Sequence, residues 1–228
     1  PDLDSARDLA ELMVSIAHRA GRKAVALLSD MNQPLGIAVG NALELKEAIC
    51  TLHGNGPADF HEHCIEIAAY MLNLGGIAST VEEARQLAVD KLQDGSAWNK
   101  FYALVAAQGG DTADIESPEQ LPQANLQGTI TASHSGYIRE LNARMIGETV
   151  VDLGGGRAKK GDQIDYGVGV EVLHNVGDQI AAGETLFIVH ASDAANMAIA
   201  CESLRSACII QESPLPALPL FYEIITGS

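Results

Sequence analysis

The amino-acid sequence predicts an α/β region, made of helices plus part of a mixed sheet, followed by a smaller β-rich unit with one helix. Residues 1–110 carry long helical segments around one apolar strand, whereas short alternating strands begin after Thr129. Between them, the polar stretch 110–127 with Pro118 and Pro122 is typical of a connection. We therefore expect two domains, residues 1–127 and residues 128–228.

Helical periodicity and stop signals define the elements of the first region. Asp4 is expected to cap a first helix that ends at Gly21, and the apolar run 24–28 is expected to form a strand. A single strand is not a sheet, so this strand must pair with strands from outside residues 1–110. Four further helices are expected over 41–52, 58–73, 80–94 and 96–108, and one face of the first helix carries Leu9, Leu12, Met13 and Ile16.

Alternating polarity predicts the elements of the second region. A helix is expected over 194–210, followed by an extended proline-containing tail and a last strand at 221–225. The other strands are expected at 129–132, 136–141, 148–153, 167–173 and 185–190.

Composition limits the classes of function. The chain has 228 residues, 47% of them hydrophobic and 19% charged, which is typical of a globular protein. Its net charge of −16 argues against a nucleic-acid partner or an anionic membrane surface, because both need clustered positive charge. No apolar run approaches the roughly 20 residues of a membrane span. We expect a cytoplasmic protein with four reduced packing thiols, Cys50, Cys64, Cys201 and Cys208.

The stretch 29–47, SDMNQPLGIAVGNALELKE, is the most informative part of the chain. An apolar strand is followed here by a loop with Pro34 and Gly36, and a helix is expected to begin at Asn41. The loop between a strand and the following helix is a usual place for a ligand site in α/β enzymes. The stretch resembles the pyrimidine-nucleoside phosphorylase and thymidine phosphorylase family. The resemblance continues in separate blocks at 54–57, 104–110, 154–160, 164–169 and 176–178.

The resemblance covers nearly the whole chain but only the C-terminal half of a family member. It implies a C-terminal domain of the barrel-sandwich type, and a reaction in which phosphate splits a pyrimidine nucleoside into base and pentose 1-phosphate. It also implies that the phosphate- and base-binding residues lie in the N-terminal half. We therefore assign no catalytic residue, expect this polypeptide alone to be inactive, and expect its partners to be the missing N-terminal half and, in the intact family, a second copy in a homodimer.

The same resemblance implies a bound monovalent cation, K⁺, held by Leu35, Ala38 and Glu47. Backbone carbonyls at 35 and 38 and one carboxylate would supply the oxygen ligands that such a cation prefers. The alternative is that Pro34 and Gly36 only turn the chain and that Glu47 is a solvated helix residue.

Gly154, Gly155, Gly156 and Arg157 form a glycine-rich segment that could approach an anion. No helical pattern starts directly after it, so it is not a P-loop. The resemblance implies a loop that orders when the domains close, and a simple hairpin tip is the alternative. Lys159 and Lys160 also allow a biotin- or lipoate-carrier interpretation, which the absence of a Met-Lys-Met context disfavours.

The remaining candidates have ordinary explanations. His61, Glu62, His63 and Cys64 lack the i, i+4 or i, i+3 histidine pair of a helical zinc site, so we expect surface histidines. Asp30 could be a catalytic carboxylate or a loop cap, and the histidines at 134, 174 and 190 lack a neighbouring nucleophile pattern. A non-catalytic binding or scaffolding module derived from the family remains the alternative function.

Overall fold

The computed structural model describes residues 2–157 and 159–227, and the chain divides into two compact units. The first unit comprises residues 1–30, 61–91 and 218–228, and the second comprises residues 31–60 and 92–217. The expected boundary between residues 127 and 128 falls inside the second unit and stays a prediction about domains. Among the residues described, no helix combines the length and apolarity needed to cross a membrane.

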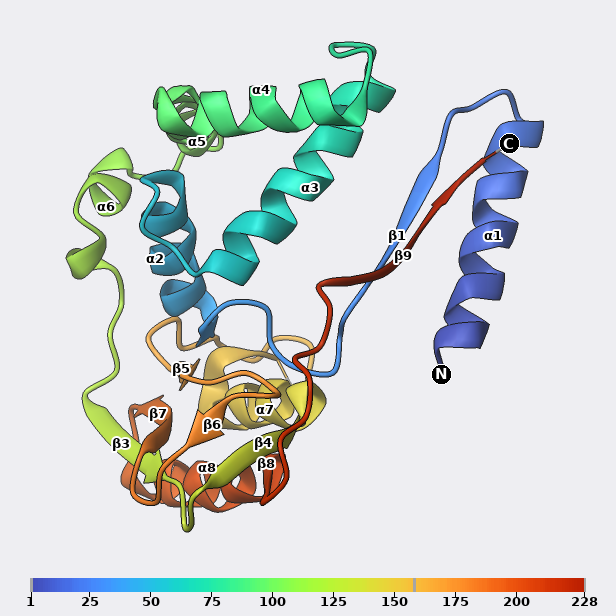
Figure 1. Cartoon of the computed structure of the whole chain (residues 1–228). Helices are drawn as coiled ribbons and strands as arrows, with labels where there is room; N and C mark the ends of the chain where they lie inside the picture. The colour runs from blue at the N-terminus through green and yellow to red at the C-terminus, as the bar shows by residue number, and fades with distance from the viewer. Residues whose placement is uncertain (1, 158, 228) are drawn as a thin grey trace. The chain divides into compact units, whose positions relative to one another are not determined.

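The first unit is built on a two-stranded antiparallel sheet of β1 (Val25–Ser29) and β9 (Phe221–Thr226), seen side by side in Figure 1. Helix α1 (Leu3–Arg19) packs on both strands, and Arg7 bonds from its Nε to Glu223 Oε2 at 2.5 Å. The expectation that β1 pairs outside residues 1–110 is confirmed, because its partner comes from the far end of this same chain. The helix cap is Asp2 rather than Asp4, since Asp2 accepts the Ser5 N–H.

The expected apolar face of α1 is present but open to solvent. Ala10 and Val14 are the buried residues of the helix. Leu9, Leu12, Met13 and Ile16 are 57–62% exposed. These four side chains form the α1 stripe, an apolar surface that stays mostly exposed among the residues described.

The rest of the first unit comes mainly from two long helices, from residue 61 onward in α3 (Ala58–Leu74) and up to residue 91 in α4 (Val81–Gln93). Arg85 of α4 bonds to two carboxylates of α3, with 2.7 Å to Glu62 and 3.3 Å to Glu66. The i, i+4 spacing of Glu62 and Glu66 places both on one face of the helix. This ion-pair cluster fixes how α4 lies against α3 within the unit.

The helical part of the second unit surrounds a small apolar core. Helices α2 (Asn41–Leu52), α5 (Ser96–Ala107) and α6 (Thr112–Glu116) meet there, together with a 3₁₀ turn at Pro118–Gln120. The stretch 110–127 is thus structured rather than a plain connection, because Asp111 caps α6 by accepting the Ala113 N–H. The buried members of this core are Ala42, Ile49, Ile115 and Leu121, with Trp98 and Phe101 packed on them.

The β-rich part of the second unit contains two antiparallel sheets. One has the order β2-β5-β7-β3, from Ala38–Val39, Gly169–Val172, Thr185–Ala191 and Leu126–Thr131. The other has the order β6-β4-β8, from Gln179–Ile180, Gly136–Leu141 and Cys208–Gln211. Helix α8 (Ala194–Ala207) packs against β3 and β7, which buries Phe187 and Leu204 completely.

The expected strand at 148–153 is wrong. This segment continues helix α7 (Ala143–Val150) into a single wide helical turn at Val151–Gly155. Asn142 caps the helix by accepting the Met145 N–H, and its buried residues are Ile146, Thr149, Val150 and Leu153. That spacing is helical, so burial of one helix face outweighs the β preference of the valines and threonine.

The expected helix at 194–210 is too long. Helix α8 ends at Ala207, and Cys208 begins β8, so Cys201 and Cys208 do not share a helix. All four cysteines are free. Cys50 and Cys64 are exposed, which corrects the expectation that all four are packing thiols.

Candidate functional site

The loop at residues 34–40, the proline–glycine loop, is tied to helix α2 by one carboxylate. Glu47 Oε1 accepts the backbone N–H groups of Ile37 and Ala38 at 2.9 and 3.0 Å. Gly36 has φ +73°, and a Cβ there would collide with the Glu47 carboxylate. The loop therefore needs glycine at 36, and Glu47 is not the solvated helix residue of the alternative interpretation.

Asp59 holds the loop from the other side. Its Oδ2 accepts the Gly36 N–H at 3.0 Å, while its Oδ1 accepts the Phe60 N–H at the start of α3. Glu44, one turn before Glu47, accepts the Gly40 N–H at 3.0 Å. Three carboxylates thus bind the amides of one short loop, while the carbonyls of Ile37 and Gly40 accept the N–H groups of Val172 and Glu44.

The three residues expected to bind the cation lie together. Leu35, Ala38 and Glu47 line one cavity of about 300 Å³. Its other walls are Pro34, Val39, Glu44, Phe60 and Ala143.

The charge in this cavity suits a cation. Burial raises the pKa of the Glu47 carboxyl, the two backbone N–H groups oppose that shift, and the nearby charges of Asp59 and Glu44 raise it further. A cation beside Glu47 would offset both the burial and the like-charge repulsion. Over residues 2–157 and 159–227, no three His, Cys, Asp or Glu side chains are grouped to hold a metal ion.

The glycine-rich loop, residues 154–157, lies against the start of the same helix. Asn41 Nδ2 donates to the carbonyl of Gly155 at 2.7 Å, and Ala42 N donates to the carbonyl of Tyr166 at 3.1 Å. Gly154 has φ +101°, which only glycine adopts readily, and its carbonyl accepts the Asp165 N–H. The segment therefore ends a helix and is not the tip of a hairpin.

Arg157 is exposed, and its Nε donates to the Asp162 carbonyl at 3.3 Å. Lys159 and Lys160 are exposed as well, and the Lys159 N–H donates to Asp162 Oδ2. Asp162 thus organises this turn, a role that the sequence did not suggest.

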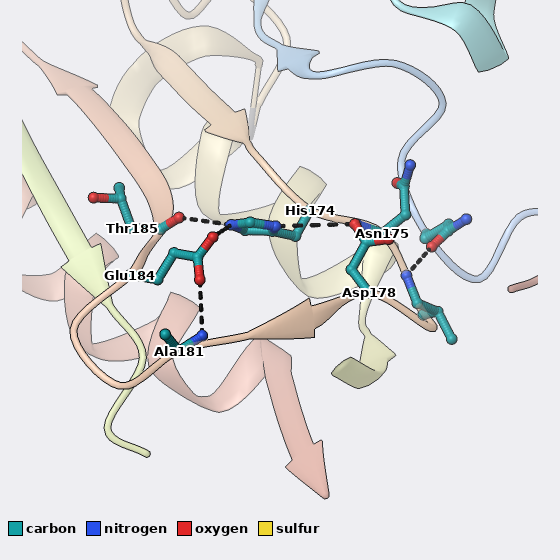
Figure 2. A network of polar contacts seen from close by, with 8 residues as sticks. His174, Asn175, Asp178, Ala181, Glu184 and Thr185 are labelled. Atoms are coloured by element: carbon teal, nitrogen blue, oxygen red, sulfur yellow. Dashed lines mark hydrogen bonds and ion pairs between the residues drawn. The ribbon is translucent and has the colours of Figure 1, made fainter. Parts of the chain in front are cut away.

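His174 has a structural position in the β-rich part, as Figure 2 shows. Its Nε2 lies 3.1 Å from the Thr185 carbonyl and 3.6 Å from Glu184, and its Nδ1 lies 3.9 Å from Asp178. Each carboxylate also accepts a backbone N–H of its own turn, from Ala181 and Asn175. The imidazole therefore joins two neighbouring turns.

The other histidines form no catalytic triad among the described residues. Buried His190 pairs through Nε2 with Glu171 Oε1 at 2.6 Å across adjacent strands. His134 contacts its neighbour Ser133. His63 is only half-exposed, and its ring stacks on that of Phe221 with 4.9 Å between the ring centroids. It is therefore not the plain surface histidine that was expected.

Asp30 stands beside β9 rather than in a polar cleft. Its Oδ1 accepts the Tyr222 hydroxyl at 2.9 Å, and its backbone N–H donates to the Leu220 carbonyl. Both contacts extend the β1–β9 pairing by one residue.

The chain matches the pyrimidine nucleoside phosphorylase C-terminal domain over residues 137–211. It is 41% identical over 225 residues to the pyrimidine-nucleoside phosphorylase of Geobacillus stearothermophilus. The matched region covers 99% of this chain and 52% of that relative. Identity to the pyrimidine-nucleoside phosphorylase of Staphylococcus haemolyticus is 43% over 225 residues, covering 98% of this chain and 51% of that protein. The chain thus spans about half the length of these relatives.

Proposed function

Because the chain belongs to the pyrimidine-nucleoside phosphorylase family, of which it carries the C-terminal region, we propose that it takes part in pyrimidine-nucleoside phosphorolysis. In this reaction phosphate attacks C1′ of the sugar as the pyrimidine base leaves. The carrying observation is the proline–glycine loop, where the three residues expected at the cation site line one cavity.

K⁺ is the cation proposed for this cavity, with carbonyl oxygens of Leu35 and Ala38 and the carboxylate of Glu47 as ligands. When bound, it would supply a fixed positive charge that offsets the buried carboxylate. The chain's own contribution is to position the loop, since Glu47 and Asp59 hold amides on both sides of the turn. This arrangement supports the proposal that the ion has a structural role rather than one in bond breaking.

Catalysis is proposed to need a second polypeptide segment, corresponding to the part of the relatives that this chain does not match. The phosphate and base sites are assigned to that segment, and this chain alone is then inactive. The exposed α1 stripe and a sheet of only two strands support the proposal, because such a sheet is marginally stable without further cover. A cytoplasmic homodimer that acts in pyrimidine salvage is the corresponding proposal for the complete enzyme.

The test is a phosphorolysis assay with uridine and thymidine, in K⁺ or Na⁺ at constant ionic strength. The chain is assayed alone and after co-expression with the N-terminal half of the Geobacillus stearothermophilus relative. We expect release of free base only from the combined polypeptides, and less of it in Na⁺. Glu47→Gln should lose the K⁺ dependence, whereas Glu148→Gln, an exposed control paired with Arg144, should keep it.

Each other outcome has a defined meaning. Base released by the chain alone would show that the catalytic groups lie within its own residues. A complex that forms but stays silent in both salts would refute the enzyme proposal and favour a non-catalytic module.

A further inference from the structure

Helix α2 connects the cation cavity to the glycine-rich loop. The residues of α2 that bond to the two loops all lie in the first two turns of the helix. Glu44 and Glu47 hold the proline–glycine loop, while Asn41, at the first position, donates to Gly155. One rigid element therefore contacts both loops, although Asn41 and Gly155 are 114 positions apart in the chain.

The backbones behind this helix are in direct contact as well. A Cβ on Gly169 would lie 2.5 Å from the Val39 carbonyl oxygen and 3.2 Å from Gly40 Cα. Strands β2 and β5 pair at this crossing, with Val39 opposite Val170. Because Gly169 has no side chain, the two backbones are in direct contact, and a displacement of the proline–glycine loop would also move β5.

The glycine-rich loop itself has few other attachments to the helix. Gly154 accepts the Asp165 N–H, and among the described residues Arg157 donates to the nearby Asp162 carbonyl. The Asn41 amide is therefore the side chain of α2 that fixes the backbone of this loop.

We propose that Asn41 is a positioning residue that transmits cation binding in the 34–40 loop to the backbone of the glycine-rich loop at Gly155. The inference rests on the proposed K⁺ site and goes beyond it, because it assigns the residue that couples the two loops. Cation binding orders the proline–glycine loop and the start of α2, and the Asn41 N–H donor then holds the Gly155 carbonyl.

Hydrogen exchange followed by mass spectrometry tests the coupling on the full chain. Exchange of peptides covering residues 151–157 is measured in KCl and in NaCl at equal ionic strength, together with the melting temperature in both salts. We expect K⁺ to raise the melting temperature and to slow exchange roughly fivefold, the lower end of common allosteric couplings.

Two substitutions isolate the side-chain donor. In Asn41→Asp and in Asn41→Ala the K⁺ effect on exchange should fall below about twofold, because neither side chain donates to Gly155, while the rise in melting temperature should remain. Asn41→Asp is nearly isosteric and favourable at a helix N-terminus, so it should fold normally. Asn55→Ala removes an exposed amide that donates to the His53 carbonyl beyond the other end of α2 and serves as the matched control.

The possible failures are distinguishable. Full K⁺ slowing in both Asn41 variants, or no slowing in the parent chain despite a K⁺-raised melting temperature, would overturn the positioning role alone. A melting temperature of the parent chain that is equal in K⁺ and Na⁺ would overturn the cation site and, with it, this inference.

Discussion

Replacing Gly169 and Gly147 by alanine should change stability in opposite directions. A Cβ on Gly169 would lie 2.5 Å from the Val39 carbonyl oxygen and 2.8 Å from Leu43 Cδ1. A Cβ on Gly147, within helix α7, would have no atom within 4 Å. Neither glycine has a positive φ, so the comparison isolates the space around the added methyl group.

The magnitudes follow from these surroundings. Ordinary contacts of a Cβ begin at 3.4 Å, so Gly169→Ala must part β2 and β5 by about 0.9 Å. Overpacking of this kind costs about 1–3 kcal/mol, and the two-residue pairing of β2 with β5 is too short to absorb it. Gly147→Ala should stabilise by about 0.5–1 kcal/mol, because alanine is the better helix former.

Urea unfolding followed by the fluorescence of Trp98, the single tryptophan, measures both changes within the second unit. In thermal unfolding we expect Gly169→Ala to melt about 2–12 °C lower and Gly147→Ala about 1–4 °C higher. A Gly169→Ala protein as stable as the parent would show that the two backbones do not touch. A destabilised Gly147→Ala protein would show that helix α7 is wrong.

Three further predictions concern the loop, the thiols and the histidine network. Gly36→Ala should lower the free energy of unfolding by about 1–3 kcal/mol and abolish the rise in melting temperature caused by K⁺. Gly54→Ala is the control, because Gly54 has φ +80° but open space around a Cβ; it should show only the backbone cost and keep the K⁺ effect. Burial raises the pKa of the Cys208 thiol from 9.0 to about 11, so between these pH values the thiol ionises in the unfolded state first and the free energy of unfolding falls as pH rises. This fall, measured by urea unfolding at pH 9 and pH 11, should be smaller in Cys208→Ala. An equal fall in both proteins would contradict the burial of the thiol. His174→Ala should lower the free energy of unfolding by about 1–2 kcal/mol, with His134→Ala near zero as its control, and equal small effects would mean that the two turns do not need the imidazole.

The elements that sequence reasoning located correctly are those whose signals are local. Pro34 and Gly36 mark a loop between a strand and a helix, and the structure has β1, the loop and α2 in that order. The residues at 35, 38 and 47 were expected together by resemblance, and they line one cavity. Local turn and loop signals, together with the motifs shared with the family, were sufficient to predict this part.

The errors come from competition between local preference and tertiary burial. Val150 and Val151 favour a strand by propensity, yet Ile146, Val150 and Leu153 bury one helical face. The apolar face of α1 shows the opposite case, because Leu9 and Met13 look like core residues but are exposed. Periodicity identifies a face without indicating what, if anything, covers it.

Partners that lie far apart in the chain could not be predicted. Asp59 follows the loop amide of Gly36 by 23 residues, and Asn41 precedes Gly155 by 114. Nothing in the sequence around Asn41 or Asp59 distinguishes it from an ordinary residue at a helix start. Such contacts follow from the topology of the chain, which one sequence read locally does not contain.

The pairing of β1 with β9 also sets the order of events during synthesis. The contact between Asp30 and Tyr222 spans 192 residues. At about 5–20 residues per second, a ribosome needs roughly 10–40 s to make the second strand after the first has emerged. During that interval β1 and the face of α1 that packs on β9 are exposed without their C-terminal partner, so a nascent chain stalled before residue 221 is the form in which this protein should depend most on chaperones.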